Sequence, residues 1–458
     1  MVFAMSERLD RVIQLVAREV DELVAVERQV ERAHIERVGG RERRRRVARR
    51  DIDLSLFRDI GRGRGWARVS IAEAVPDLES LLRRAVQRAA RAVGPGWGLP
   101  PPSAAARVDI ADPAMDSDVM TAADAIGRSL DEPIGSGFRV GSLAIVIERG
   151  RTDIRTSRGL THGHSHTLLT IEAMIALAEG TSGVVERLHV QSRQLAALDL
   201  PVALSRAVQQ LDDRNKAILL VPGRYDLVVA RDALVPRNVG YGRALVADFD
   251  AAVFGERPAR YGWFEPIVAQ ADARADRIGL TRYRPGQLIY GDRVVTGDPL
   301  TVVSDGTVPF GLLSRPLGDL GEPVRRFVII ERGTATDLAF DLREAALRGV
   351  TANGGLSNLV IAPGTLSPGA MREPVQRPVV EVADLRWLDI DSSTGMFTAE
   401  LGLSYLHDGS RDVRPVRGGF VHGNIFDYLP AIRLSSRTKT HSWYLGPESM
   451  RLSDVTVA

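Results

Sequence analysis

Residues 286–333, GQLIYGDRVVTGDPLTVVSDGTVPFGLLSRPLGDLGEPVRRFVIIERG, decide the fold. The stretch begins with a run rich in β-forming residues and passes through turns dense in Gly and Pro. It ends in a strand that carries Arg325 and Arg326 and closes on Glu331, Arg332 and Gly333. Gly and Pro interrupt regular structure and favour tight turns, so the pattern predicts short strands joined by turns.

The same texture continues over the C-terminal half of the chain. Short apolar runs separated by Gly and Pro follow from about residue 216 onward. The main exception is residues 338–348, a predicted short helix with Asp337 as N-cap and Gly349 at its end. We therefore predict an α+β protein. A mixed helix and antiparallel-sheet domain is expected over residues 1–218, and a β-rich C-terminal domain over residues 219–458.

The N-terminal half alternates helical and strand patterns. Apolar residues at intervals of three and four predict amphipathic helices near residues 5–20, 75–93, 118–130 (capped by Ser117 or Asp116) and 203–211. Gly39–Gly40 lies between two charged, partly alternating runs and predicts a hairpin whose return strand is residues 41–50, RERRRRVARR. Further strands are predicted at 138–148, at 152–158 as its partner, and at 161–175.

Composition excludes several classes of protein. The chain has 458 residues, 44% hydrophobic and 26% charged, with a net charge of +2, which is ordinary for a globular protein. No apolar run approaches the length of a transmembrane helix, and the start lacks the features of a signal peptide. We therefore expect a cytoplasmic protein without a membrane partner. The absence of Cys excludes disulfides, thiolate ligands and a cysteine nucleophile.

Three histidines lie close together in the predicted strand 161–175, at His162, His164 and His166. Residues two apart in a strand share a face, and neutral imidazole is a good ligand for zinc, copper or nickel. One interpretation is a metal site. The other is a polar strand face or an exposed turn, because a single strand rarely supplies a complete catalytic site.

Charged residues offer further candidates, each with a structural alternative. Asp305, Asp319 and Glu322 could bind a cation or transfer protons, but acidic turn residues more often cap backbone amides. Arg325 and Arg326 could clamp a carboxylate; strand alternation places one on each face, with one expected to be a buried partner of Glu322 or Glu331. The basic run 41–50 could contact phosphates, but a solvated hairpin edge is favoured, so nucleic-acid binding is not expected.

The motifs themselves resemble those of the TldD/PmbA family, in which PmbA is also called TldE. Asp305–Gly311 (DGTVPFG) and Gly321–Arg326 (GEPVRR) are similar to the central block of that family. The segments NLVIAPGTLSP (358–368), DSSTGMF (391–397) and GFVHGN (419–424) are similar to later family motifs. The resemblance covers most of the chain but is weaker in the N-terminal half.

One family feature is missing. The TldD branch carries a His-Glu-x-x-x-His zinc helix and a downstream Cys, whereas the matching region here, Asp226–Phe254, contains no His and the chain contains no Cys. The resemblance therefore implies the PmbA/TldE branch: no catalytic residue and no cofactor in this chain, and zinc in a TldD-like catalytic partner. The two chains would form a heteromer that encloses short or unfolded peptides, or peptide-like natural products.

The resemblance also suggests which segments line such a chamber, namely 305–311 and 418–424. The candidate chamber residues are Asp305, Phe310, Arg325, Arg326, His422 and Asn424. Two other functions stay open at this point: an autonomous metal-dependent hydrolase at His162, His164 and His166, and a non-enzymatic scaffold or binding protein. A homodimer without a different partner is also compatible with the sequence.

Overall fold

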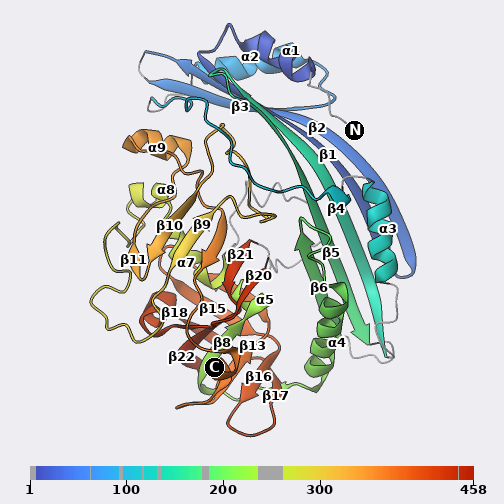
Figure 1. Ribbon diagram of the computed structural model, residues 1–458, viewed down its shortest axis with the longest axis vertical. Helices are drawn as coiled ribbons and strands as arrows, with labels where there is room; N and C mark the ends of the chain where they lie inside the picture. Colours follow the sequence, from blue (N-terminus) through green and yellow to red (C-terminus); the bar gives the residue numbers. More distant parts are fainter. Residues whose placement is uncertain are drawn as a thin grey trace.

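The computed structural model describes residues 7–61, 63–91, 96–115, 118–130, 137–177, 185–235, 261–441 and 443–458. A long, curved sheet from the N-terminal half wraps around a β-rich C-terminal half (Figure 1). The expected α+β fold with a β-rich C-terminal region is confirmed. No helix in the described part of the chain is long and apolar enough to cross a membrane.

The N-terminal sheet has six antiparallel strands in the order β3-β2-β1-β4-β5-β6. Gly39 and Gly40 both have positive φ, and they form the tight turn of the predicted hairpin between β1 and β2. The strands are β1 Glu22–Val38, β2 Arg41–Asp59, β3 Arg64–Ala72, β4 Phe138–Thr156, β5 Thr161–Leu177 and β6 Val185–Ser192.

All four longer helices pack on one face of this sheet. The odd-numbered residues Leu23 and Ala25 of β1 lie in one core cluster with α1 and α2, whereas Ala33 and Ile35 lie in another with α3 and α4, so both helix pairs share the outer face. The helices are α1 Glu7–Val16, α2 Leu78–Ala89, α3 Val119–Ser129 and α4 Leu200–Lys216, with a 3-10 turn at Pro113–Met115. The inner face is left to meet the C-terminal half.

The C-terminal half contains two further sheets. One has the order β11-β10-β9-β12-β21-β20; its strands are β9 Val302–Asp305, β10 Arg326–Glu331, β11 Thr334–Ala335, β12 Asn358–Ile361, β20 Thr438–His441 and β21 Tyr444–Pro447. The other has the order β14-β15-β18-β22-β8-β13-β16-β17-β7, with β19 paired to β22; its strands are β7 Ile218–Leu219, β8 Gly223–Ala230, β13 Val379–Val382, β14 Leu385–Ile390, β15 Met396–Leu401, β16 Ser404–His407, β17 Arg414–Arg417, β18 Phe420–Asn424, β19 Arg433–Leu434 and β22 Ser449–Val457.

Short helices connect these strands and cover their large shared core. They are α5 Arg231–Leu234, α7 Glu265–Ala269, α8 Ala273–Arg277, α9 Leu342–Arg348, α10 Pro368–Arg372 and α11 Ile425–Tyr428, with 3-10 turns at Gly262–Phe264 and Leu429–Ala431. Trp263 and Phe264 lie in the core with no more than 1% of their surface exposed. The two halves meet through a smaller cluster in which Val24 and Val26 of the inner sheet face pack with Leu317 and Leu342.

Two local predictions were wrong. Residues 138–148 and 152–158 were expected to be partner strands, but 138–156 is one strand that pairs with β1 and β5. The helix expected at 338–348 begins at Leu342, because Asp341 rather than Asp337 accepts the capping bond from the Glu344 amide. The third helix is likewise capped by Asp118; the caps expected for it, 116 and 117, lie outside the described residues.

Candidate functional site

The inner face of the N-terminal sheet gathers histidines from three strands, β1, β5 and β6. Even-numbered residues of β1 face inward, as Val24 and Val26 do, and this places His34 on that face. On β5 the inward position opposite Ile154 is His162, so His164 and His166 follow on the same face. His189 of β6 is paired with Glu172 across the ladder and completes the set. Five of the eight histidines of the chain therefore share one surface.

These histidines differ in their partners. His166 Nε2 lies 3.2 Å from Glu148 Oε1, and Arg32 Nε donates to the other oxygen of Glu148 at 2.5 Å. His189 Nδ1 lies 3.1 Å from Glu172 Oε1. The rings of His162 and His164 stack with their centroids 5.5 Å apart. Burial, followed by the neighbouring His166 and His162, lowers the pKa of His164 to about 3, so this imidazole is neutral at physiological pH.

His162, His164 and His166 share one face of β5, as predicted. The ring of His166, however, is directed to Glu148. Within the described ranges, no group of three or more His, Asp or Glu side chains is placed to hold a metal ion. The sequence has no His between His189 and His407, so a His-Glu-x-x-x-His helix is absent from that stretch of the sequence. Of the region 226–254, residues 236–254 lie outside the described part of the structure.

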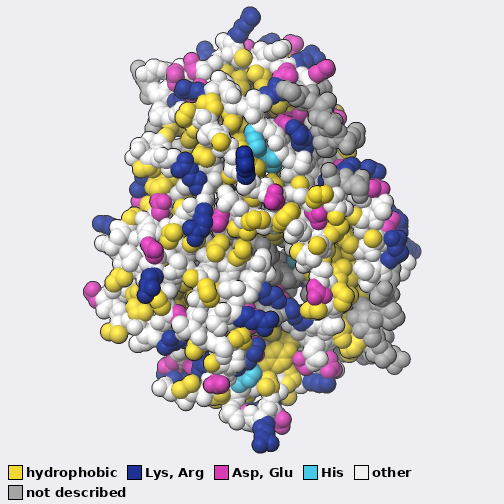
Figure 2. Space-filling view, viewed as in Figure 1, with side chains coloured by type: hydrophobic (Ala, Val, Ile, Leu, Met, Phe, Trp, Pro, Cys, Tyr) yellow, Lys and Arg dark blue, Asp and Glu magenta, His cyan; other side chains and the backbone are white. Residues whose placement is uncertain are grey.

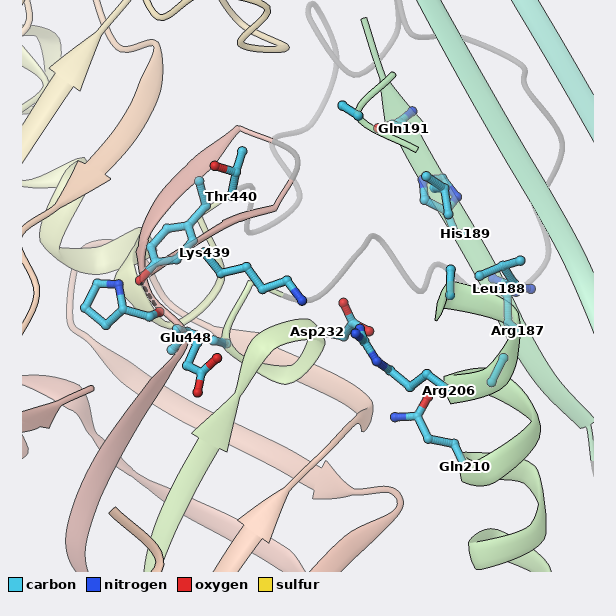
Figure 3. Close-up of a pocket in the computed structure, with 17 residues that line it drawn as sticks. Arg187, Leu188, His189, Gln191, Arg206, Gln210, Asp232, Lys439, Thr440 and Glu448 are labelled. Carbon is cyan, nitrogen blue, oxygen red and sulfur yellow. Dashed lines mark hydrogen bonds between the residues drawn. The ribbon is translucent and has the colours of Figure 1, made fainter. Parts of the chain in front are cut away.

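A cavity of about 220 Å³ lies where β6 and α4 face the C-terminal half. Arg206 from α4 and Lys439 from β20 extend toward Asp232 from opposite sides, and His189 and Gln191 of β6 border the same space (Figure 3). In the space-filling view, basic side chains gather near the centre, where the two halves of the molecule meet (Figure 2). The cavity thus joins the polar inner face of the sheet to the C-terminal half.

A second, larger cavity of about 850 Å³ lies between β1–β3 and the C-terminal half. Its wall is dense in charge, but much of that charge is paired: Arg28 with Asp53, Arg274 with Asp341, and Arg277 Nε with Glu344 Oε2 at 3.0 Å. Each of these pairs lies within one half of the chain, and the pairing leaves less charge for a ligand.

The first four chamber candidates lie together around the turn that follows β9. Asp305 Oδ1 accepts hydrogen bonds from the Thr307 amide at 2.8 Å and the Thr307 hydroxyl at 2.7 Å, the usual work of a turn aspartate. Arg326 pairs with Asp305 across the ladder, with Nε 3.8 Å from Oδ2. Phe310 has a positive φ of 53°, and its amide donates to the Asp109 carbonyl at 2.6 Å. The prediction that Arg325 or Arg326 is buried was wrong, because both are exposed.

The other two candidates lie on β18. His422 is exposed, and Asn424 caps α11 by accepting a bond from the Phe426 amide at 3.0 Å while donating to the Thr394 carbonyl at 3.0 Å. None of the six candidates borders either of the two cavities described above. Their role in a chamber stays a prediction.

Sequence reasoning missed the basic residues of the smaller cavity. Arg187, Arg206 and Lys439 are far apart in the chain and belong to no motif. One signal was available: the chain has 60 Lys and Arg residues, and Lys439 is one of only two lysines. In a chain that otherwise uses arginine, a lysine is a candidate functional residue.

Comparison with known proteins agrees with this fold. Residues 289–458 match the model of the PmbA/TldA metallopeptidase C-terminal domain. Over its whole length the chain resembles the crystal structure of TldE from Thermococcus kodakarensis, with a TM-score of 0.73, 15% identity and coverage of 98% of this chain and 99% of that one. It also resembles a candidate modulator of DNA gyrase from Bacteroides thetaiotaomicron VPI-5482, with a TM-score of 0.76, 15% identity and 98% coverage of both chains.

One curated relative matches a much smaller part of the chain. An uncharacterised protein from Methanocaldococcus jannaschii is 21% identical over 170 residues, which span 35% of this chain and 39% of that protein. The C-terminal region, residues 289–458, is therefore a domain of the PmbA/TldD family. The complete chain has the fold of the solved TldE structure and of the candidate gyrase modulator.

Proposed function

We propose that this chain is the TldE-like subunit of a heteromeric peptidase, in which a TldD-type partner holds zinc and the two chains together enclose a peptide. The observation that carries the proposal is the likeness to TldE along 98% of the chain. It is combined with a sequence that has no Cys and no His between His189 and His407. The metallopeptidase description of the matching C-terminal domain supports the reaction class.

The geometry of this chain suits a wall of such a chamber. The four longer helices lie on the outer face of the sheet, so the inner face is turned toward the interior. That face presents imidazoles together with Thr170 and Gln191, whose side chains are joined by a bond of 3.4 Å. A polar face of this kind can bind the backbone of an extended peptide, whose N–H and C=O groups need partners once water is excluded.

The residues of each chain suggest which role it would have in the complex. Zinc in the partner would polarise the scissile carbonyl and activate water. This chain would bind and orient the peptide on its inner face and restrict the access of larger substrates. Its histidines that are paired with carboxylates, His166 and His189, would keep fixed positions along that path.

Co-expression with a TldD-type protein from the same genome tests the proposal. We expect the two chains to co-purify and the mixture to cleave unfolded peptides, whereas each chain alone is much less active. The matched control is the mixture in which the partner's zinc-helix glutamate is replaced by Gln, which should assemble but not cleave. Cleavage by this chain alone would contradict the proposal.

Metal analysis separates the proposal from an autonomous enzyme. The chain should be purified alone and without a His-tag, and its zinc, copper and nickel measured. We expect far less than one metal ion per chain. One ion per chain, lost together in the His162→Ala, His164→Ala and His166→Ala variants, would overturn the non-metal assignment and place a metal site at these histidines.

A further inference from the structure

The smaller cavity has an apolar wall and a basic rim. Ala203, Ala207, Leu234 and Pro447 supply apolar surface, and Arg187, Arg206 and Lys439 supply positive charge. Two acidic residues also border it. Glu448 is directed to Arg437, with 3.5 Å between Oε2 and Nε, and Asp232 lies between Arg206 and Lys439 (Figure 3). The three basic residues outnumber the two carboxylates that border the cavity.

Two of these cations have no anionic partner of their own. Arginines elsewhere on this half are commonly paired, for example Arg214 with Glu186 at 2.7 Å and Arg149 with Glu31 at 2.8 Å. In the described residues, by contrast, no ion pair or side-chain hydrogen bond involves Arg187 or Arg206. The Gln210 amide, one helical turn beyond Arg206, borders the same space and likewise has no partner there. Unpaired guanidinium groups at a cavity are prepared to bind an anion with planar oxygens.

The size of the cavity limits the ligand. About 220 Å³ is below the range of roughly 300–1,000 Å³ that is typical of sites for drug-sized ligands. The cavity therefore has room for the end of a chain rather than for a whole peptide. An apolar wall beside a basic rim fits one small apolar side chain next to a carboxylate.

We propose that this cavity binds the C-terminal carboxylate of a peptide, with Arg206 and Arg187 holding the carboxylate and the alanines of α4 contacting the last side chain. The inference rests on the proposed function, because it assigns the end of the enclosed peptide to one place in the chamber. It adds a substrate class: peptides with a free C-terminus and a small apolar last residue. A side-chain carboxylate has the same chemistry and is distinguished by the experiment.

Fluorescence anisotropy with three hexapeptides, each labelled at its N-terminus, tests the proposal. The first ends in Ala with a free carboxylate, the second in Ala-amide, and the third in Glu-amide. Binding is measured on the full chain and again on its complex with the partner. We expect the free acid to bind roughly tenfold or more tightly than either amide, since charge-assisted hydrogen bonds are lost on amidation.

Variants assign the effect to the cavity. Arg206→Gln together with Arg187→Gln should bring the affinity for the free acid close to that for Ala-amide and leave the latter almost unchanged. Arg206→Lys, which keeps the charge, should retain much of the preference. The matched control is Arg43→Gln, an exposed arginine of β2 that borders neither cavity, and its preference should equal that of the wild type. Circular dichroism confirms that each variant is folded.

Each of the other outcomes would reject a specific part of the proposal. Equal affinity for the free acid and Ala-amide, or an equal loss in the control, would reject the carboxylate site and leave the chamber intact. Tight binding of Glu-amide that the double variant removes would assign the cavity to a side-chain carboxylate and reject the C-terminal assignment. No binding of any peptide to the chain or its complex would reject the proposed function, and this inference with it.

Discussion

Arg451 and Asp226 form a buried ion pair between two neighbouring strands, although 225 positions separate them in the chain. Arg451 on β22 donates to Asp226 Oδ2 on β8 from Nη2 at 2.7 Å and from Nε at 3.2 Å. The Nη1 of the same guanidinium reaches the carbonyls of Met371 at 3.1 Å and Glu373 at 3.0 Å. Asp226 Oδ1 accepts from the Asp454 amide at 2.9 Å. The pair thus joins two central strands of the larger sheet to the end of α10.

Removing one member of this pair should destabilise the chain strongly. Asp226→Ala leaves the guanidinium buried without a counter-charge, and we expect a loss of about 3–5 kcal/mol in the free energy of unfolding. Urea unfolding followed by circular dichroism measures it. The double variant Asp226→Leu with Arg451→Met removes both charges and should cost clearly less than the sum of the single changes. Additive losses would show that the pair acts as two independent contacts.

Local chemistry explains which elements could be predicted from the sequence. The Gly39–Gly40 hairpin was predictable because the turn requires positive φ at both positions and the flanking runs are long. The predicted strands 138–148 and 152–158 are one continuous strand that includes Gly150. Gly150 lies in the middle of β4, where a Cβ atom would come within 2.4 Å of the His166 ring, so this glycine gives the imidazole room. Only the paired strand reveals that reason.

Long-range contacts explain the rest. Asp337 caps no helix because Ala339 pairs with Asp272 and the Phe340 amide donates to Asn353 at 2.9 Å, which keeps the segment extended. In the candidate site, the common face of His162 and His164 followed from strand alternation alone. Their convergence with His34 and His189 depends on the register of four strands, and the basic cavity depends on how the two halves meet.

Gly306, in the turn that decides the fold, should not tolerate a side chain. A Cβ atom there would lie 2.0 Å from Cγ1 of the buried Val324, so Gly306→Ala is expected to cost about 1–3 kcal/mol by overpacking. The matched control is Gly369→Ala in α10, where the nearest atom would be 3.9 Å away. Because Ala favours helix over Gly, the control should gain about 0.5–1 kcal/mol. Thermal unfolding of both variants measures the contrast, and equal stability of the two would contradict the overpacking.

Glu322 should make the protein less stable as the pH rises. Burial raises the pKa of its carboxyl, although the nearby Arg315 opposes the rise, and Oε2 accepts a bond from the Leu320 amide at 2.9 Å. Above pH 4.5 the unfolded chain releases this proton before the folded chain does, so the free energy of unfolding falls with pH up to the folded pKa. Glu322→Gln, a neutral isostere, should therefore be more stable than the wild type at pH 8 and nearly equal at pH 4. An advantage that does not change with pH would contradict an ionisation effect.

His164 should produce the opposite pH dependence. Burial, with His166 and His162 nearby, lowers the pKa of this imidazole from 6.5 to about 3 in the folded chain. Below pH 6.5 the unfolded chain binds a proton that the folded chain does not, so stability is lost as the pH falls from 6.5 toward 3. At 1.36 kcal/mol for each pH unit, this imidazole costs about 2 kcal/mol at pH 5 compared with pH 7.5.

Urea unfolding of His164→Gln at both pH values measures this difference. The variant should lose less stability on acidification than the wild type, by about 2 kcal/mol, since glutamine does not titrate. Some dependence should persist, because burial also lowers the pKa of His162. The control His422→Gln changes an exposed imidazole on β18 and should follow the wild type at both values. If both variants follow the wild type, the imidazole of His164 is accessible to protons in the folded chain, and the inner face of the sheet is open to water at that point.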